Sequence, residues 1–444
     1  MTTAPAALQR RLHLRDAVVI GLGSMIGAGV FAAFAPAARA SGRGLLVGLL
    51  IAAVVALCNA TSSAQLAARY PESGGTYVYG RRVLGEWWGF LAGWSFVIGK
   101  TASCAAMALV FASYAVPTAW QRPTAIAAVI VLAAVNSRGV TKTARLAALL
   151  VTVSLAVLVL FVAAGAAGGL PHASESLALT RPAAGGPGDG LLAAGPYGIL
   201  QAAGLLFFAF AGYARVATLG EEVVDPVRTI PRAIVVALAI TVVVYAAVAV
   251  TLLGALGARA LGDSTSPLAD ALTAAGSPAL VPLMRVGAAV ASLGALLGLI
   301  AGIGRTSLAM AREGDLPRWL AAVHPRFGVP HRAELALAAV VTVLLVVCDL
   351  RGAIAFSSFG VLLYYFVANV AALRQPAPER RYPRALAAVG AVLCVILVAT
   401  VPPVGIVAGV AVLLVGVVSR VVMQRRVTRR RAARRGSDPL RDPS

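Results

Sequence analysis

Charged residues are scarce in this chain, and acidic residues are scarcer than basic ones. Only 12% of its 444 residues are charged, whereas a typical soluble domain carries about 25%. Hydrophobic residues make up 59%, and the mean hydropathy is +0.87. This composition excludes a soluble globular protein and indicates a protein that crosses a membrane several times.

Cysteine and histidine are also rare, with four of each. The cysteines are dispersed and form no CxxC pair, so we interpret them as small apolar packing residues. All four histidines fall outside the apolar segments, which excludes a histidine relay or histidine metal site within the membrane. The chain has no HExxH or GxSxG motif, so a membrane enzyme is not expected. No metal and no cofactor are expected either.

Long apolar segments divide the chain. A helix needs about 20 apolar residues to span a bilayer. Twelve segments come close to or exceed this length, although the fourth is short and only Pro402-Pro403 separates the last two. The predicted spans are 17–38, 44–68, 84–116, 123–137, 145–169, 196–220, 231–257, 282–311, 333–350, 353–373, 383–401 and 403–423.

The basic residues are distributed unevenly between the loops. With twelve spans, 29 of the 38 Lys and Arg fall on the side of the N-terminus, seven on the opposite side and two within spans. The positive-inside rule therefore places both termini in the cytoplasm. It also explains the net charge of +21 without nucleic-acid binding. We expect the basic tail from residue 424 to lack fixed structure and the Gly/Pro-rich loop 170–195 to be external.

The first span contains the segment GLGSMIGAGVF, residues 21–31. Each glycine lowers helix stability by about 1 kcal/mol relative to alanine, so four glycines in nine residues predict an interrupted helix. Backbone groups freed at mid-membrane must face protein, water or a ligand rather than lipid. This favours a binding site at the membrane midplane, which is typical of a transporter.

The sixth span contains FFAFAGYAR, residues 207–215, which is a weaker signal of a second interruption. If spans one to five and six to ten are inverted repeats, the first and sixth spans are equivalent. Freed N–H groups at both interruptions would attract a carboxylate, and freed carbonyls would attract an ammonium group. The predicted substrate-binding residues are Gly23, Ser24, Met25, Ile26, Gly27, Ala28, Gly29, Phe207, Phe208, Ala209, Phe210, Ala211 and Gly212.

Four stretches resemble the amino acid–polyamine–organocation (APC) superfamily of permeases, including its bacterial cationic amino acid transporter-like branch. They are the 21–31 segment, YPESGGTY at 70–77, the region from Phe207 through EEVVDP to IPR at 230–232, and MAREGDLP at 310–317. The resemblance covers roughly residues 12–375. It implies a leucine-transporter type fold, all-α, with a 5+5 inverted repeat plus two C-terminal helices, and proton-coupled or exchange-coupled amino acid transport.

The chain departs from some of these relatives at two positions. Ser154 stands where proton-coupled members resembling cationic amino acid transporters have a lysine, and Ala214 stands where others have an acidic residue. Lys100 and Arg215 are charged residues that lie inside spans, and such residues are functional candidates. We predict that Lys100 carries a proton or substitutes for a cation. Arg215 is a candidate for a gating ion pair, although a structural role stays open for both residues.

Glu221 and Glu222 follow the sixth span and are further gating candidates. The expected organisation is a cytoplasmic N-terminus (1–16), a first repeat (17–169), an external loop (170–195), a second repeat (196–373), two further helices (383–423) and a basic cytoplasmic tail (424–444).

The sequence thus predicts a multi-pass plasma-membrane transporter that takes up a neutral or zwitterionic amino acid by alternating access, in symport with protons. The basic residues in the core disfavour a cationic substrate. The alternatives are an amino acid/polyamine exchanger for basic substrates and, more distantly, a channel. Substrate and bilayer are the expected partners, and a monomer and a homodimer are both compatible with the sequence.

Overall fold

The computed structural model describes residues 12–71, 74–138, 144–168, 170, 190–217 and 222–436, and these are almost entirely helical. Its α-helices are α1 (Leu14–Met25), α2 (Ala28–Ala32), α3 (Phe34–Ser41), α4 (Leu45–Arg69), α5 (Thr76–Leu84), α6 (Glu86–Ala115), α7 (Gln121–Ser137), α8 (Ala144–Gly168), α10 (Gly195–Phe210), α11 (Ala214–Ala217), α12 (Pro226–Asp263), α13 (Pro267–Ala274), α14 (Val281–Arg312), α15 (His331–Val347), α16 (Leu350–Arg374), α17 (Arg384–Thr400) and α18 (Pro403–Gly436).

The predicted membrane spans match these helices. Within the described residues, 10 helical stretches are long and apolar enough to cross a membrane. Two further spans predicted from the sequence correspond to α15 and α17, which have 17 residues each. The prediction of an all-α, multi-pass membrane protein is confirmed.

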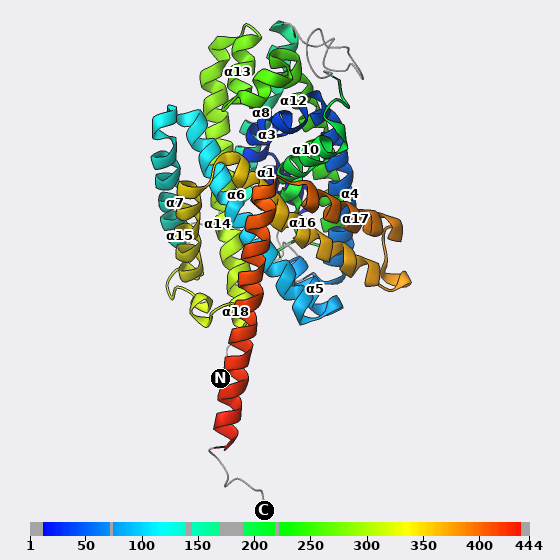
Figure 1. The fold of residues 1–444 in the computed structure, drawn as a ribbon, viewed down its shortest axis with the longest axis vertical. Coiled ribbons are helices and arrows are strands. Elements are labelled where there is room, and N and C mark those ends of the chain that lie inside the picture. Colours follow the sequence, from blue (N-terminus) through cyan, green and yellow to red (C-terminus); the bar gives the residue numbers. More distant parts are fainter. Residues whose placement is uncertain are drawn as a thin grey trace, which may run out of the picture.

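The most buried of the spanning helices are α6, α10 and α16. Helix α6 packs against both α14 and α16, while α4 packs against α10 and α12. Helices α7 and α15 lie together at one edge (Figure 1). At the crossing of α6 and α16, a Cβ on Gly360 would lie 2.7 Å from the Ser95 carbonyl oxygen and 2.8 Å from the Gly99 Cα. Small residues permit this close backbone approach, which is how helices pack tightly within a membrane.

The C-terminal tail differs from its prediction. Helix α18 continues to Gly436, well past residue 424, and projects beyond the rest of the bundle (Figure 1). The basic residues after position 424 therefore extend a helix that begins in the membrane, because Arg and Ala favour helix continuation. Most of the predicted external loop lies outside the described residues.

A short backbone pairing holds the N-terminal end of α1. Leu12 forms an isolated parallel bridge with Val223: its N–H donates to the Glu222 carbonyl (3.0 Å), and its own carbonyl accepts from the Val224 N–H (2.8 Å). This pairing joins the start of the first span to the segment that follows the sixth. The pairing therefore holds the first and sixth predicted spans together at one end.

Candidate functional site

The first span is interrupted at Ile26 and Gly27. Helix α1 ends at Met25, Ile26 has ψ of 46° and Gly27 has φ of −96° and ψ of −142°, both outside the helical region. Helix α2 begins at Ala28. Gly21 and Gly23 thus remain helical, and the opening occurs at one position within the glycine-rich segment rather than along all of it.

The sixth span is interrupted as well. Helix α10 ends at Phe210, a 3-10 turn covers Ala211–Tyr213, and α11 begins at Ala214. The four predicted residues Phe207 to Phe210 therefore form the last turn of α10, whereas Ala211 and Gly212 lie in the interruption itself.

The two interruptions touch each other through their backbones. A Cβ added to Gly212 would collide with the carbonyl group of Ser24 and would lie 2.6 Å from the Met25 nitrogen. A Cβ added to Gly29 would lie 2.7 Å from the Ala209 Cα. Real Cβ atoms do not approach backbone so closely, so glycine is required at both points. The sequence-predicted segments, separated by about 180 positions, therefore meet in one place.

The remaining predicted residues of the first interruption point in different directions. A Cβ added to Gly23 would lie 2.6 Å from Val151 Cγ2 of α8, and a Cβ added to Gly27 would lie 2.7 Å from Ala295 Cβ of α14. The Ser24 hydroxyl donates to the Ile20 carbonyl one turn earlier (2.9 Å). Gly23 thus serves packing against α8 and does not contact the second interruption.

Two tyrosines join the interruptions to the rest of the bundle, and the sequence analysis did not identify either. The Tyr245 hydroxyl of α12 lies 2.6 Å from the Met25 carbonyl oxygen and 3.1 Å from that of Ala209. The Tyr365 hydroxyl of α16 lies 3.3 Å from the Ala211 carbonyl oxygen. Buried tyrosine hydroxyls need a hydrogen-bond partner. Here freed backbone carbonyls provide it.

The phenylalanines of the sixth span pack on these same tyrosines. Phe210 lies against Tyr245 with ring centroids 5.0 Å apart, and Phe207 meets Tyr365 edge-on at 5.8 Å. Phe208 is 7% exposed, whereas Phe207 and Phe210 are fully buried. The aromatic side chains thus enclose the junction of the two interruptions.

We expect Tyr245→Phe to slow transport about fivefold, because it removes a hydrogen bond, worth about 1 kcal/mol, to the backbone just before the two interruptions. Initial uptake rates in proteoliposomes would measure the effect. The control is Tyr364→Phe, whose hydroxyl accepts from the Thr76 N–H (3.1 Å) away from the interruptions. Equal slowing in both variants would show that Tyr245 contributes only general stability.

Lys100 of α6 reaches the second interruption. Its side chain is buried, with 7% exposure, and Nζ donates to the Ala211 carbonyl oxygen at 3.1 Å. The Tyr365 hydroxyl shares this acceptor. A buried ammonium group whose hydrogen-bond acceptor is a neutral carbonyl is unusual, because burying a charge costs free energy unless an opposite charge balances it. The geometry therefore places this lysine in contact with the sixth-span interruption.

Arg215 and Glu222 lie near the end of the sixth span. A Cβ on Gly302 of α14 would lie 3.5 Å from Arg215 Nη1, so this side chain points toward α14. Glu222 is 3.9 Å from Arg305, also of α14. Both gating candidates thus approach the same helix, away from the contact between the interruptions. Glu221 lies outside the described residues.

A second group of buried charges surrounds Asp315, just after α14. Its carboxylate is 3.0 Å from Arg420 Nε and 3.4 Å from Arg81 Nη1, and it accepts a hydrogen bond from the Tyr77 hydroxyl at 2.9 Å. The side chains of Asp315 and Arg420 are 3% and 1% exposed. The YPESGGTY and MAREGDLP motifs therefore meet in space through Tyr77 and Asp315.

Arg420 lies near the end of the twelfth predicted span, and its side chain is buried. Its guanidinium lies over the rings of Trp87 and Phe90, with centroid distances of 4.4 and 4.7 Å, and donates to the Glu86 carbonyl at 3.1 Å. Cation–π contacts together with the ion pair to Asp315 explain why this arginine is buried. They fasten α18 to the start of α6.

Burial governs the titration of this group. It raises the pKa of the Tyr77 phenol, and the adjacent Asp315 charge adds to the effect, so the hydroxyl stays protonated and donates. Burial also raises the pKa of Asp315, while the charge of Arg420 and the hydrogen bond from Tyr77 act in the opposite direction. The charged form of the buried Asp315 carboxylate therefore depends on stabilisation by Arg420 and Tyr77.

Asp315→Asn should destabilise the protein by about 3–5 kcal/mol, because it removes the nearer and buried of the two carboxylates that pair with Arg420, leaving only Glu86 at 3.8 Å. Thermal unfolding of the purified protein in detergent would show this as a lower Tm. The exposed pair between Arg39 and Asp263, at 3.0 Å and with side chains 52% and 70% exposed, provides the control. Asp263→Asn should change stability by about 0–1 kcal/mol. Similar Tm losses in both variants would contradict the assignment.

Two interrupted helices that meet inside a bundle of spanning helices define the class of this protein as a membrane transporter. Among the described residues, no three His, Cys, Asp or Glu side chains gather to hold a metal ion. Comparison with protein families gives the particular assignment. The family model described as "Amino acid permease" matches residues 12–426, so the chain belongs to the amino acid permease family of the APC superfamily.

Individual relatives support the same family. An uncharacterized transporter of Mycobacterium tuberculosis is 56% identical over 96% of this chain and 94% of its own length. The methylthioribose transporter of Bacillus subtilis is 28% identical over 73% of this chain and 72% of its own length. The branched-chain amino acid permease BcaP of the same organism is 26% identical over 75% and 73%. The protein is a permease and not an enzyme.

Proposed function

We propose that the protein transports a neutral or zwitterionic amino acid by alternating access, in symport with protons. The observation that carries the proposal is the contact between the two interruptions, where Gly212 lies against Ser24 and Met25. A membrane-embedded junction of this kind supplies freed backbone groups of both signs. An α-amino acid presents the complementary carboxylate and ammonium groups.

The substrate head would bind along the two backbone segments. Backbone N–H groups at the first interruption favour the carboxylate, and carbonyl groups of the sixth-span interruption favour the ammonium. Phe207, Phe208 and Phe210 surround this junction, and their movement would open or close it. The junction is buried, so binding and release require the helices that carry the interruptions to separate from their neighbours.

Lys100 would couple protons to this cycle. Its ammonium group donates to the Ala211 carbonyl oxygen at the second interruption. A protonated Lys100 would place a positive charge beside the substrate carboxylate, and loss of the proton would remove that charge. Proton binding and substrate binding would then favour each other, as symport requires. This linkage also disfavours cationic substrates, which would compete with a charge already in place.

The charge distribution supports the proposed orientation. The excess of Lys and Arg on one set of loops supports cytoplasmic termini, and the proposed location is the plasma membrane. The interruptions in spans one and six support the division into repeats 17–169 and 196–373, with 383–423 outside the repeat.

A ligand panel tests the substrate class. Ligands that bind the folded protein raise its stability, by about 2.7 kcal/mol at a concentration of 100 times Kd. We expect one or more neutral amino acids to raise the Tm of the purified protein in detergent. Stabilisation by arginine, lysine or polyamines alone would favour the exchanger for basic substrates. Stabilisation by methylthioribose alone would overturn the amino acid assignment.

A further inference from the structure

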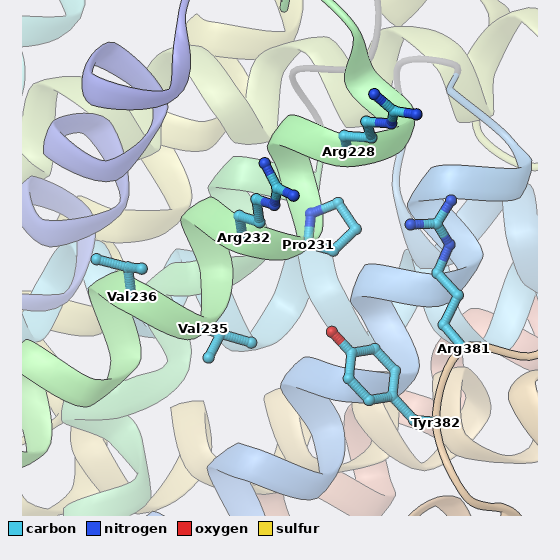
Figure 2. Close-up of a pocket in the computed structure, with 7 residues that line it drawn as sticks. All are labelled: Arg228, Pro231, Arg232, Val235, Val236, Arg381 and Tyr382. Carbon is cyan, nitrogen blue, oxygen red and sulfur yellow. The ribbon is translucent and has the colours of Figure 1, made fainter.

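A basic groove lies at the start of α12, away from the two interruptions. Its volume is about 600 Å³, and its lining residues are Arg228, Pro231, Arg232, Val235, Val236, Arg381 and Tyr382. Figure 2 shows two arginines and two valines projecting from α12, and Arg381 and Tyr382 contributed by the connection between α16 and α17. The groove therefore has a cationic part and an apolar part.

The three arginines are available to a ligand. Arg228 and Arg232 are one turn apart on α12 and are exposed, and Arg228 approaches Asp225 only at 3.9 Å. The third, Arg381, is exposed as well. Each guanidinium has five donors in a planar fork that suits phosphate oxygens. Three of them around one groove form a recognition site for an anionic phosphate group.

The connection that supplies Arg381 is fixed against α4. The backbone N–H of Arg381 donates to Gln65 Oε1 at 3.4 Å, and Glu379 pairs with Arg69 at 3.1 Å. A second anchor is the Arg380 side chain, whose Nε donates to the Gln375 carbonyl at 2.8 Å. The groove therefore lies between α12 and a connection whose backbone is held in place by these contacts.

The apolar part of the groove continues onto the outer face of α12. Val235 and Val236 are 37% and 43% exposed, and one and two turns later Ile240 and Val243 are 37% and 69% exposed. These residues share one face of a spanning helix, where side chains face lipid tails. A free phosphate ion would use only the arginines, whereas a phospholipid would use both parts.

We propose that this groove binds the headgroup of an anionic phospholipid, with the acyl chains along the outer face of α12. Arg228, Arg232 and Arg381 contact the phosphate, and Val235 and Val236 contact the first methylene groups. The bound lipid bridges the start of α12 to the connection between α16 and α17. This site is independent of the proposed transport substrate.

Native mass spectrometry of the delipidated full-length protein, titrated with phosphatidylglycerol or phosphatidylcholine, tests the proposal. The wild type should retain phosphatidylglycerol preferentially. Arg228→Gln/Arg232→Gln/Arg381→Gln should lower its affinity for that lipid by about fivefold per arginine, on the order of a hundredfold in total. The equivalent triple lysine variant should keep most of the affinity, which separates loss of charge from misfolding.

The control variant is Arg318→Gln/Arg326→Gln/Arg332→Gln, which removes two exposed arginines from the connection after α14 and one from the start of α15. It should retain the lipid at wild-type affinity. Three outcomes would overturn the proposal: unchanged lipid affinity in the groove variant, an equal loss in the control, or displacement of the lipid by inorganic phosphate. The last outcome would indicate a simple anion site.

Discussion

Gly212→Ala should reduce transport on the order of a hundredfold while the protein still inserts and folds. The added Cβ would collide with the Ser24 carbonyl and the Met25 nitrogen, at the end of α1 just before the first interruption. Overpacking of this kind costs about 1–3 kcal/mol, and each 1.4 kcal/mol is about tenfold in rate. Initial uptake rates in proteoliposomes with matched protein content would measure the loss.

A second variant and a control support this test. Gly29→Ala should act like Gly212→Ala, because its Cβ would lie 2.7 Å from the Ala209 Cα. Gly302→Ala should leave transport near the wild-type rate, since its Cβ would meet only Arg215 Nη1, at an ordinary contact distance of 3.5 Å. Wild-type transport by Gly212→Ala would show that the interruptions do not need their close contact.

Lys100→Met should abolish uptake that is driven by a proton gradient, while exchange of substrate across the membrane survives. Methionine keeps the approximate volume but removes both the ammonium group and its hydrogen bond to Ala211. Uptake of labelled substrate with an inward proton gradient should fall to the level of protein-free liposomes. Exchange against substrate preloaded inside should remain detectable, because it needs no net proton movement.

Lys100→Arg separates two possible roles of the lysine. Arginine keeps a positive charge and cannot release its proton in a protein. If Lys100 carries the proton, this variant should fail in gradient-driven uptake as Lys100→Met does. Retention of uptake would instead indicate that a fixed positive charge substitutes for a cation. Gradient-driven uptake by Lys100→Met itself would exclude both roles.

The sequence was sufficient to predict the membrane-spanning helices and the presence of both interruptions, whereas the short helices α5 and α13 were not predicted. Apolar length located the spans, including α17 and α18, which are separated only by Val401 and Pro402. Glycine content located the first interruption within a few residues. Glycine content could not show that the helix opens at Ile26 and Gly27 in particular, because the conformation of each glycine also depends on the residues that pack against it. Gly23, for example, remains helical and packs against Val151 of α8.

The residues that join distant elements could not be predicted. Tyr245 and Tyr365 lie in ordinary apolar spans, and their only signal was a hydroxyl group that must find a partner within the membrane. Arg420 lies near the end of the twelfth predicted span and was counted with the charges of the cytoplasmic side, yet it is buried against Asp315, Trp87 and Phe90. Pairings of this kind depend on how helices pack, which hydropathy and charge counts do not contain.

The central claim is that the protein moves an amino acid together with protons. The most direct test is uptake of a radiolabelled amino acid panel into proteoliposomes, with and without an inward proton gradient. The account predicts saturable uptake of neutral amino acids that depends on the gradient. Uptake only into liposomes preloaded with amino acid would indicate an exchanger and contradict proton coupling, and uptake of no amino acid at all would contradict the assigned substrate class.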